Sequence, residues 1–241
     1  MKTYTATFLI AILVFTGQAF SQLKLPKILA KNTTTTGITE NEAAQGIKEA
    51  LSQGVTNAVL NLNKTDGFFG SDIYKMLLPP DAKKAETTLR KAGMGAQVDK
   101  AILSINRGAE DAVAFAKPIF IDAIKEMTLT DALNIVKGNK DAATLYFKQK
   151  TTEKLTAAFK PSVQSSLEKV NATKYYGDIV TTYNKLPTTF NKVNPDLTSY
   201  VVGKAVEALF DQVAKEEANI RANPAARATD ILKKVFGSVI K

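Results

Sequence analysis

The chemistry open to this chain is limited first by the side chains that it lacks. It contains neither Cys nor His. Thiol nucleophiles, Ser-His-Asp triads, haem and iron–sulfur ligation and the usual zinc ligands are therefore excluded. Any catalysis would depend on Asp, Glu, Lys, Arg or Tyr, and we expect no metal and no cofactor.

One group of polar residues interrupts the longest apolar stripe of the sequence. Asn106 falls four residues after Ile102, at the edge of an apolar helix face, and Glu110 lies on the same side four residues further on. A buried polar group without a partner costs about 1–3 kcal/mol. Asn106, Arg107 and Glu110 therefore form either a structural network between helices or a polar ligand site. Gly108, which lowers helix propensity by about 1 kcal/mol relative to Ala, suggests that another backbone approaches closely there.

A second polar group lies near the C-terminus. Glu216 and Glu217 fall between apolar positions of one helical stripe, and Arg221 follows Glu217 by four residues, the favourable orientation for an ion pair. On an exposed face such a pair is worth only about 0.3–0.5 kcal/mol. The alternative is a pair of carboxylates at a helix interface, with Arg107 or Arg227 as the partner.

These carboxylates also permit a catalytic interpretation. Glycoside hydrolysis needs only two carboxyl groups at a suitable separation. Glu110 or Glu217 could then be the general base of a hydrolase or lyase that acts on envelope glycan or another small substrate. Nothing in the spacing fixes the separation of the two groups, so we favour a binding or structural role.

Aromatic residues offer two further candidates. The loop Asp66-Gly67-Phe68-Phe69 could contact a ligand, although glycines around two phenylalanines favour a tight connection whose rings enter the core. Amphipathic aromatic side chains recur later in the chain. They suit either ligand stacking or a core position with the hydroxyl at the rim, and they are Tyr146, Phe147, Tyr175, Tyr176, Tyr183 and Tyr200.

The chain is basic, with a formal net charge of +9 and a pI of about 9.5. The excess is almost entirely Lys, spread singly, and the only arginines are Arg90, Arg107, Arg221 and Arg227. Nucleic-acid binding normally shows clustered Lys and Arg with interleaved aromatics, so we expect no nucleic-acid partner. A small ligand, or an anionic envelope component such as lipid or polysaccharide held through lysines, remains open as the partner.

The first 21 residues have the pattern of a secretory signal peptide. Lys2 supplies a positive start, an apolar run extends from Ala6 to Phe15, and Ala19-Phe20-Ser21 places small residues before the cleavage point. The run is too short for a membrane anchor, and no later segment is apolar enough to span a bilayer. We therefore expect a mature protein that begins near Gln22 and is free in the periplasm or secreted. Residues 22–38, rich in Thr, are expected to form a flexible leader.

From Thr39 onward the pattern predicts helices. Thr39 and Glu42 form a capping box that opens a helix to about Leu62. The longest predicted helix runs from about Ala96 to Met127, with a kink or interruption at Pro118.

Caps and breakers bound the other predicted helices. These are 80–91 closed by Gly93, Thr130 or Asp131 to Gly138, 139–170 with a break before Pro161, 173–186 capped by Thr173, Asn194-Pro195 to about Ala222, and Asn223-Pro224 onward. No segment alternates with the period of a strand. The expected fold is therefore all-α, a single bundle-like domain over residues 39–241 with about eight or nine helices and no sheet.

Several of these motifs, in this order, resemble the bacterial family of uncharacterised proteins DUF4197. The matching segments are Gly46-Ile47-Lys48-Glu49-Ala50-Leu51, Asp66-Gly67-Phe68-Phe69, Leu78-Pro79-Pro80, Asn106-Arg107-Gly108-Ala109-Glu110, Ala116-Lys117-Pro118-Ile119-Phe120, Asp141-Ala142-Ala143-Thr144 and Glu216-Glu217 through Arg221 to Arg227. The resemblance covers nearly the whole mature chain, and Gly108 departs from it where Ala is expected. It implies an exported helical protein and no particular activity.

Our leading hypothesis is a non-enzymatic binding or structural domain of the bacterial envelope. In it, one connected polar network would join the longest helix to the C-terminal helices. Its members would be Asn106, Arg107, Glu110, Glu216, Glu217, Arg221 and Arg227. Replacing Arg107 with Ala should then cost about 3–5 kcal/mol, because a buried carboxylate would lose its partner.

Overall fold

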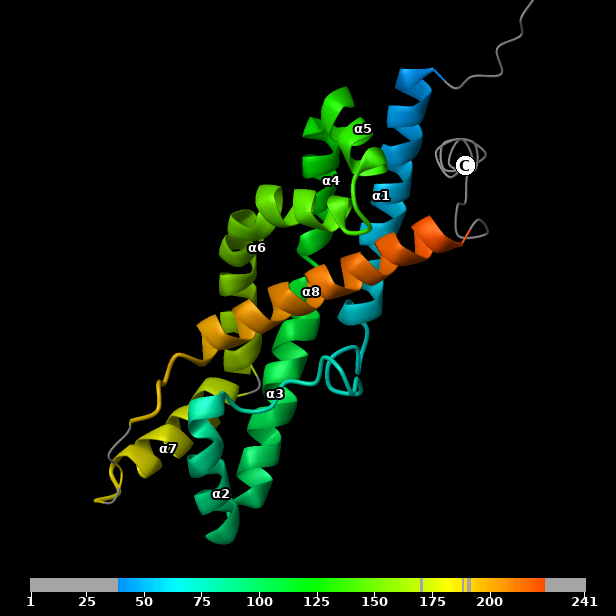
Figure 1. The fold of residues 1–241 in the computed structure, drawn as a ribbon. Helices are drawn as coiled ribbons and strands as arrows, with labels where there is room; N and C mark the ends of the chain where they lie inside the picture. The colour runs from blue at the N-terminus through cyan, green and yellow to red at the C-terminus, as the bar shows by residue number, and fades with distance from the viewer. Residues whose placement is uncertain (1–38, 170, 188, 190–191, 224–241) are drawn as a thin grey trace, which may run out of the picture. The chain divides into compact units, whose positions relative to one another are not determined.

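The computed structural model describes residues 39–169, 171–187, 189 and 192–223. The described part is helical, and no strand occurs in it (Figure 1). Its elements are α1 (Glu40–Asn63), the 3-10 helix η1 (Pro80–Ala82), α2 (Lys83–Lys91), α3 (Gly95–Val113), α4 (Ala116–Glu126), α5 (Leu129–Lys137), α6 (Ala142–Lys169), α7 (Ala172–Asn184) and α8 (Leu197–Ala222). The all-α prediction is confirmed, although the predicted number of helices and several of their boundaries are slightly off.

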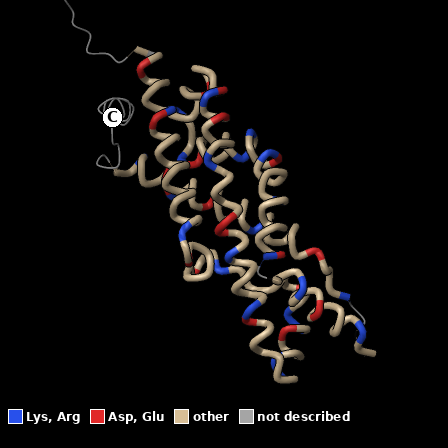
Figure 2. The backbone as a smooth tube through the Cα atoms, turned by 180° about the vertical axis from the view of Figure 1, so that it is seen from behind, with Lys and Arg blue, Asp and Glu red and all other residues tan. Residues whose placement is uncertain are grey.

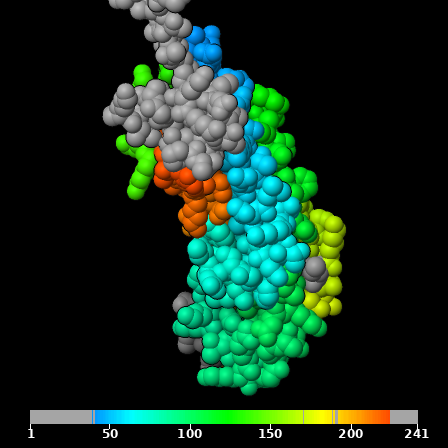
Figure 3. All heavy atoms as spheres, turned by 90° about the vertical axis from the view of Figure 1, so that its right-hand side faces the viewer, coloured from blue at the N-terminus to red at the C-terminus, as the bar shows by residue number. Residues whose placement is uncertain are grey.

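Helix α3 lies at the centre of the packing. It contacts α1, α2, α6, α7 and α8. Helix α8 in turn packs across α1, α3 and α6 (Figure 1). The large buried rings and branched chains between these helices form one main core, which includes Phe68, Phe120, Phe147, Phe159 and Leu155. A smaller core joins α1, α5, the start of α6 and the end of α8 around Ile47 and Ile135. Figure 3 shows α1 and the loop after it, blue to cyan, beside the end of α8 in orange.

The start of the first helix agrees with its sequence signature. The Thr39 hydroxyl accepts the Glu42 N–H at 3.2 Å, and the Glu42 carboxylate accepts the Thr39 N–H at 2.9 Å. Each group satisfies a backbone donor that a helix terminus leaves free. Gly93, at φ +84°, likewise ends α2 as expected, because glycine adopts this left-handed conformation without strain.

The predicted helix from Ala96 to Met127 is interrupted, as its proline indicated, and forms the two helices α3 and α4. It breaks at Ala114 and Phe115, and α4 begins at Ala116 with Pro118 in its first turn. Proline has no N–H to donate to the carbonyl four residues earlier, that of Ala114. The break therefore lies where Pro118 removes a hydrogen bond, and the first turn of α4 tolerates the missing donor.

The predicted break before Pro161 does not occur, since α6 is continuous across it. Pro161 and Ala157, whose carbonyl loses its donor, are both exposed, so water can replace the missing bond. Phe159 and Val163, buried on the opposite side, hold the helix in the core.

Three predicted helix starts lie about two residues from the observed ones. Thr128 caps α5 through a capping box with Asp131, and Asp196 caps α8 by accepting the Ser199 N–H at 3.0 Å. Asn171, in the left-handed region at φ 55°, precedes α7 in place of Thr173. Thr128 and Asp196 thus cap through their side chains, whereas the Asn171 side chain makes no capping hydrogen bond. The predicted signal peptide, the leader and the helix after Pro224 lie outside the described residues.

No helix in the described part of the chain has the length and hydropathy needed to cross a bilayer. Among the same residues, no group of three or more acidic side chains could hold a metal ion. Lys and Arg are spread along the helices and interspersed with Asp and Glu (Figure 2).

Candidate functional site

Glu110 connects α3 to the loop after α1. Its side chain is 4 % exposed. One carboxylate oxygen accepts the N–H groups of Phe68 at 3.0 Å and Phe69 at 3.1 Å, and the other accepts from Arg107 at 2.6 Å. The Glu110 carbonyl also accepts from the Asn63 amide at 2.8 Å. Glu110 thus satisfies two backbone donors of a loop that has no helix of its own.

Arg107 holds the same loop from its outer side. Its guanidinium donates to Glu110 and, at 2.7 Å, to Asp66, and it lies 5.7 Å from the ring of Phe69. The hydrogen bond to Glu110, followed by that to Asp66, raises the pKa of Arg107 above its ordinary value. The side chain remains 32 % exposed. Asn106-Arg107-Glu110 and the loop candidates Asp66 to Phe69, singled out separately, therefore meet.

Asn106 fixes the far end of this loop. The Asn106 side chain accepts the Met76 N–H at 2.8 Å and donates to the Met76 carbonyl at 2.8 Å and to the Ile102 carbonyl at 2.7 Å. Asn106 is fully buried. Its amide thus completes the backbone hydrogen bonding of a residue in an irregular segment, which would otherwise be unsatisfied inside the protein.

The tight turn in this loop needs glycine. A Cβ at Gly67 would overlap the Leu62 carbonyl, and Asp66 already adopts the left-handed conformation at φ 65°. Phe68 enters the core, as the sequence indicated, while Phe69 stays half-buried with the Lys75 ammonium 4.3 Å from its ring centre.

The expectation at Gly108 needs a correction. A side chain, not another backbone, approaches Gly108, because a Cβ there would lie 3.2 Å from Cδ2 of Leu167. That distance is tighter than ordinary van der Waals contact. The small residue therefore allows α3 and α6 to pack closely.

Glu217 supports a different element, the start of α6. Its two oxygens accept the Ala143 N–H at 3.0 Å, the Thr144 N–H at 2.9 Å and the Thr144 hydroxyl at 2.7 Å. The two N–H groups belong to the first turn of α6 and have no partner within that helix, so Glu217 of α8 caps α6. Arg221 donates to Glu217 at 2.8 Å and to the Ile135 carbonyl at 2.8 Å, which joins the end of α5 to the same cluster.

The expected ion pair of Glu217 with Arg221 is therefore present. Its side chains are only 5 % and 19 % exposed, so the pair does not lie on an exposed helix face. Glu216 points elsewhere and accepts from the Asn57 amide at 3.3 Å. Arg227 lies outside the described residues. Among the hydrogen bonds and ion pairs between described residues, none joins the Arg107 cluster to the Glu217 cluster.

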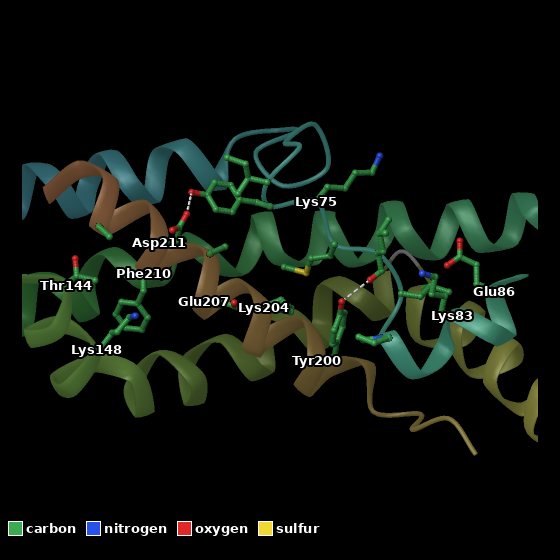
Figure 4. Close-up of a pocket in the computed structure, with 18 residues that line it drawn as sticks. Lys75, Lys83, Glu86, Thr144, Lys148, Tyr200, Lys204, Glu207, Phe210 and Asp211 are labelled. Carbon is green, nitrogen blue, oxygen red and sulfur yellow. Dashed lines mark hydrogen bonds and ion pairs between the residues drawn. The ribbon is translucent and has the colours of Figure 1, made fainter. Parts of the chain in front are cut away.

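A groove in the described part of the chain is lined by none of the charged residues of the two clusters. The groove has a volume of about 810 Å³ and runs along α8, with the segment from Ile73 to Pro80 as one wall (Figure 4). Helix α2 contributes Lys83 and Glu86, and α6 contributes Thr144 and Lys148. The lining side chains of α8 are Tyr200, Lys204, Glu207, Ala208, Phe210, Asp211 and Ala214.

Both polar clusters support this groove from behind. Asn106 fixes Met76, which lies in the wall, and Glu110 fixes the loop that leads into it. Glu217 binds Thr144, which lines the groove at the start of α6. Asn106, Glu110 and Glu217 thus hold the walls of the groove, but none of these three residues lines it.

One end of the groove carries a hydrogen-bonded group that sequence reasoning missed. The Tyr74 hydroxyl donates to Asp211 at 2.8 Å and accepts from Lys215 at 2.7 Å. Burial raises the pKa of Tyr74, and the hydrogen bond from Lys215 lowers the pKa of Asp211. The group joins the loop to α8 across 137 residues of sequence, so no local pattern could show it.

The aromatic candidates have mainly structural roles. Tyr176 is buried, and its hydroxyl donates to the Asn194 carbonyl at 3.0 Å, while Tyr146 donates to the Ala123 carbonyl at 3.2 Å. Tyr200 lines the groove and donates to the Leu77 carbonyl at 3.2 Å, so it also fixes the wall. Two apolar residues of the groove lining, Ile73 and Leu77, are 71 % and 57 % exposed, an unusual pair on a loop that only the fold reveals.

Comparison with family models matches residues 37–237 to a family described as protein of unknown function (DUF4197). Comparison with curated proteins and with solved structures finds no match.

Proposed function

The chain belongs to the DUF4197 family, and from this premise we propose that it is an exported, non-enzymatic domain of the bacterial envelope that binds an amphipathic ligand in the groove along α8. The groove itself carries the proposal. Its volume of about 810 Å³ falls within the range of roughly 300–1,000 Å³ that small-molecule sites occupy.

The lining of the groove suits a ligand with an apolar body. Met76, Leu77 and Leu78 form one wall, and Ala208 and Ala214 leave room on the α8 side. Leu77 is exposed, and a ligand that covers it would remove apolar surface from water, which is favourable. Tyrosines and lysines stand among these apolar residues and can fix the orientation of a polar head.

The polar clusters favour binding over catalysis. A general base needs a lone pair that can reach a substrate proton. Both oxygens of Glu110 and both oxygens of Glu217 already accept hydrogen bonds from the backbone or from an arginine or threonine. Both carboxylates are also buried, which supports a structural role for them.

Export rests on the N-terminal sequence. Expression of the full chain in a Gram-negative host, followed by fractionation and intact-mass measurement, should give a periplasmic or secreted protein that begins near Gln22. A full-length chain that stays in the cytoplasm would contradict this part of the proposal.

The binding proposal is tested with aminoanthracene, a neutral apolar fluorophore whose emission rises on burial. We expect saturable binding to the parent protein. Ala214→Trp should abolish it, because the indole would occupy the groove. Ala218 is exposed one turn further along α8, outside the groove lining, so Ala218→Trp is the matched control and should bind like the parent. Failure of the parent to bind, or unchanged binding to Ala214→Trp, would refute the proposal.

A further inference from the structure

The charges along the groove are not evenly balanced. Each acidic residue in the lining already has a cationic partner. Glu86 pairs with Arg90 at 2.9 Å, Glu207 with Lys204 at 2.7 Å and Asp211 with Lys215 at 3.0 Å. The acidic groups therefore leave no net negative charge in the groove.

Three lining lysines form no ion pair with a described acidic residue: Lys75, Lys83 and Lys148. The Lys75 ammonium lies over Phe69 and points away from the groove (Figure 4). Lys83 and Lys148 stand near opposite ends of the groove (Figure 4). They are the two candidates for holding an acidic group.

The surroundings of these two lysines differ. Lys83 lies close in sequence to Asp81 and Glu86, and the Arg90 that pairs with Glu86 also pairs with Asp99. Near Lys148, by contrast, the carboxylate of Asp211 faces both Lys148 and Lys215, while Glu217, bound to the nearby Thr144, is paired with Arg221. This end thus has an excess of one positive charge.

An aromatic ring also borders the Lys148 end. The Lys148 side chain is exposed, and its ammonium lies 5.9 Å from the centre of the Phe210 ring. The Tyr74 hydroxyl lies at the same end and is held by Asp211 and Lys215.

We infer that the ligand of the groove is a single-chain amphiphile with an acidic head, such as a fatty acid, whose head lies at Lys148 and whose chain runs along α8 toward Tyr200. This inference rests on the proposed function of the groove. Tyr200 and Ala214 are fourteen residues apart on one helix, a distance of about 21 Å, so the groove accepts an extended alkyl chain.

The test compares two ligands with the same chain, dodecanoate and dodecanol, by displacement of aminoanthracene. It uses the parent, Lys148→Met and Lys83→Met, because Met is unbranched, only one atom shorter than Lys, and uncharged. We expect dodecanoate to bind the parent about five-fold more tightly than dodecanol, the gain that a partly exposed ion pair of about 1 kcal/mol supplies. Lys148→Met should remove this preference, and Lys83→Met should keep it.

Equal affinity of the parent for the two ligands, or a preference that survives Lys148→Met, would overturn the inference. Binding of aminoanthracene to the parent would still support the groove as a ligand site. Loss of the preference in Lys83→Met alone would place the head at the other end and would also overturn it. If aminoanthracene does not bind the parent at all, the proposed function fails first. The two failures are therefore distinguishable.

Discussion

The side-chain amide of Asn106 pairs with the backbone of Met76 in both directions, as donor and as acceptor, each at 2.8 Å. A helix side chain thus supplies the hydrogen bonds that the backbone of Met76, in an irregular segment, does not obtain from a helix of its own. Because Met76 lies in the groove wall, this pair links the central helix of the fold to the proposed ligand site.

Asn106→Ala should destabilise the protein and weaken ligand binding together. The substitution leaves the N–H and C=O of Met76 buried without partners, and we expect a loss of about 2–4 kcal/mol in the free energy of unfolding. Denaturant unfolding measures this loss. Asn134 is exposed on α5, and Asn134→Ala should change the free energy by less than about 0.5 kcal/mol.

The binding part of this prediction needs a comparison at equal stability. Leu167→Ala removes a buried core side chain of α6 that does not line the groove, and it should also cost about 2–5 kcal/mol. At a temperature where both variants are folded, Asn106→Ala should bind aminoanthracene more weakly than Leu167→Ala. Equal affinities would show that Asn106 stabilises the fold without positioning the wall.

Arg107 and Glu110 should differ in their contributions to stability. Arg107 is one-third exposed and Glu110 keeps two backbone donors without it, so Arg107→Ala should cost about 1–2 kcal/mol, less than the 3–5 kcal/mol that a sealed pair would cost. Glu110→Ala strands the N–H groups of Phe68 and Phe69 and the Arg107 charge, and should cost about 3–4 kcal/mol. Chemical denaturation of both variants checks the order, and a larger loss for Arg107→Ala would contradict it.

Glu217 and Glu216 provide an internal comparison on adjacent positions. Glu217→Ala removes the acceptor for the first turn of α6 and the partner of Arg221, and we expect a loss of about 2–4 kcal/mol. Glu216→Ala removes one contact at 3.3 Å and should cost about 0.5 kcal/mol or less. Thermal unfolding of the two variants would contradict this account if their midpoints fell by the same amount.

Acid should weaken the start of α5. Hydrogen bonds from the Thr128 hydroxyl and N–H lower the pKa of Asp131 in the folded protein. A carboxylate with a lowered folded pKa adds stability above its unfolded pKa of about 4, and this stability is lost as the pH falls through the folded value. Stability measured from pH 5 down to pH 2 should therefore fall less steeply in Asp131→Asn than in the parent. An unchanged slope would show that Asp131 has no part in the acid response.

Local signals in the sequence were sufficient for much of the fold. The capping box of Thr39 and Glu42 and the stop at Gly93 depend on residues within four positions of one another, so sequence reveals both partners. Pro118 and Pro161 show the limit of such signals. Both lack the backbone N–H donor, but only Pro118 accompanies a helix break. Around Pro161, buried neighbours hold α6 in the core and water can replace the missing hydrogen bond.

The candidate site shows the same limit at longer range. Apolar periodicity placed Asn106 and Glu110 at the edge of a buried helix face, and the structure buries both of them. Their partners are backbone groups of a loop 30 to 42 residues earlier, and backbone groups carry no residue-type signal. The groove needs α2, α6, α8 and that loop at once, so its lining could only be found from the fold.

A crystal structure of the protein with ω-brominated dodecanoate tests the central claim most directly, since the anomalous signal of bromine locates the end of the chain. The account predicts a bromine peak near Tyr200 and Leu78, with the carboxylate in contact with the Lys148 ammonium. A bromine peak beside Lys148, a peak elsewhere on the molecule, or an empty groove at saturating ligand would contradict it.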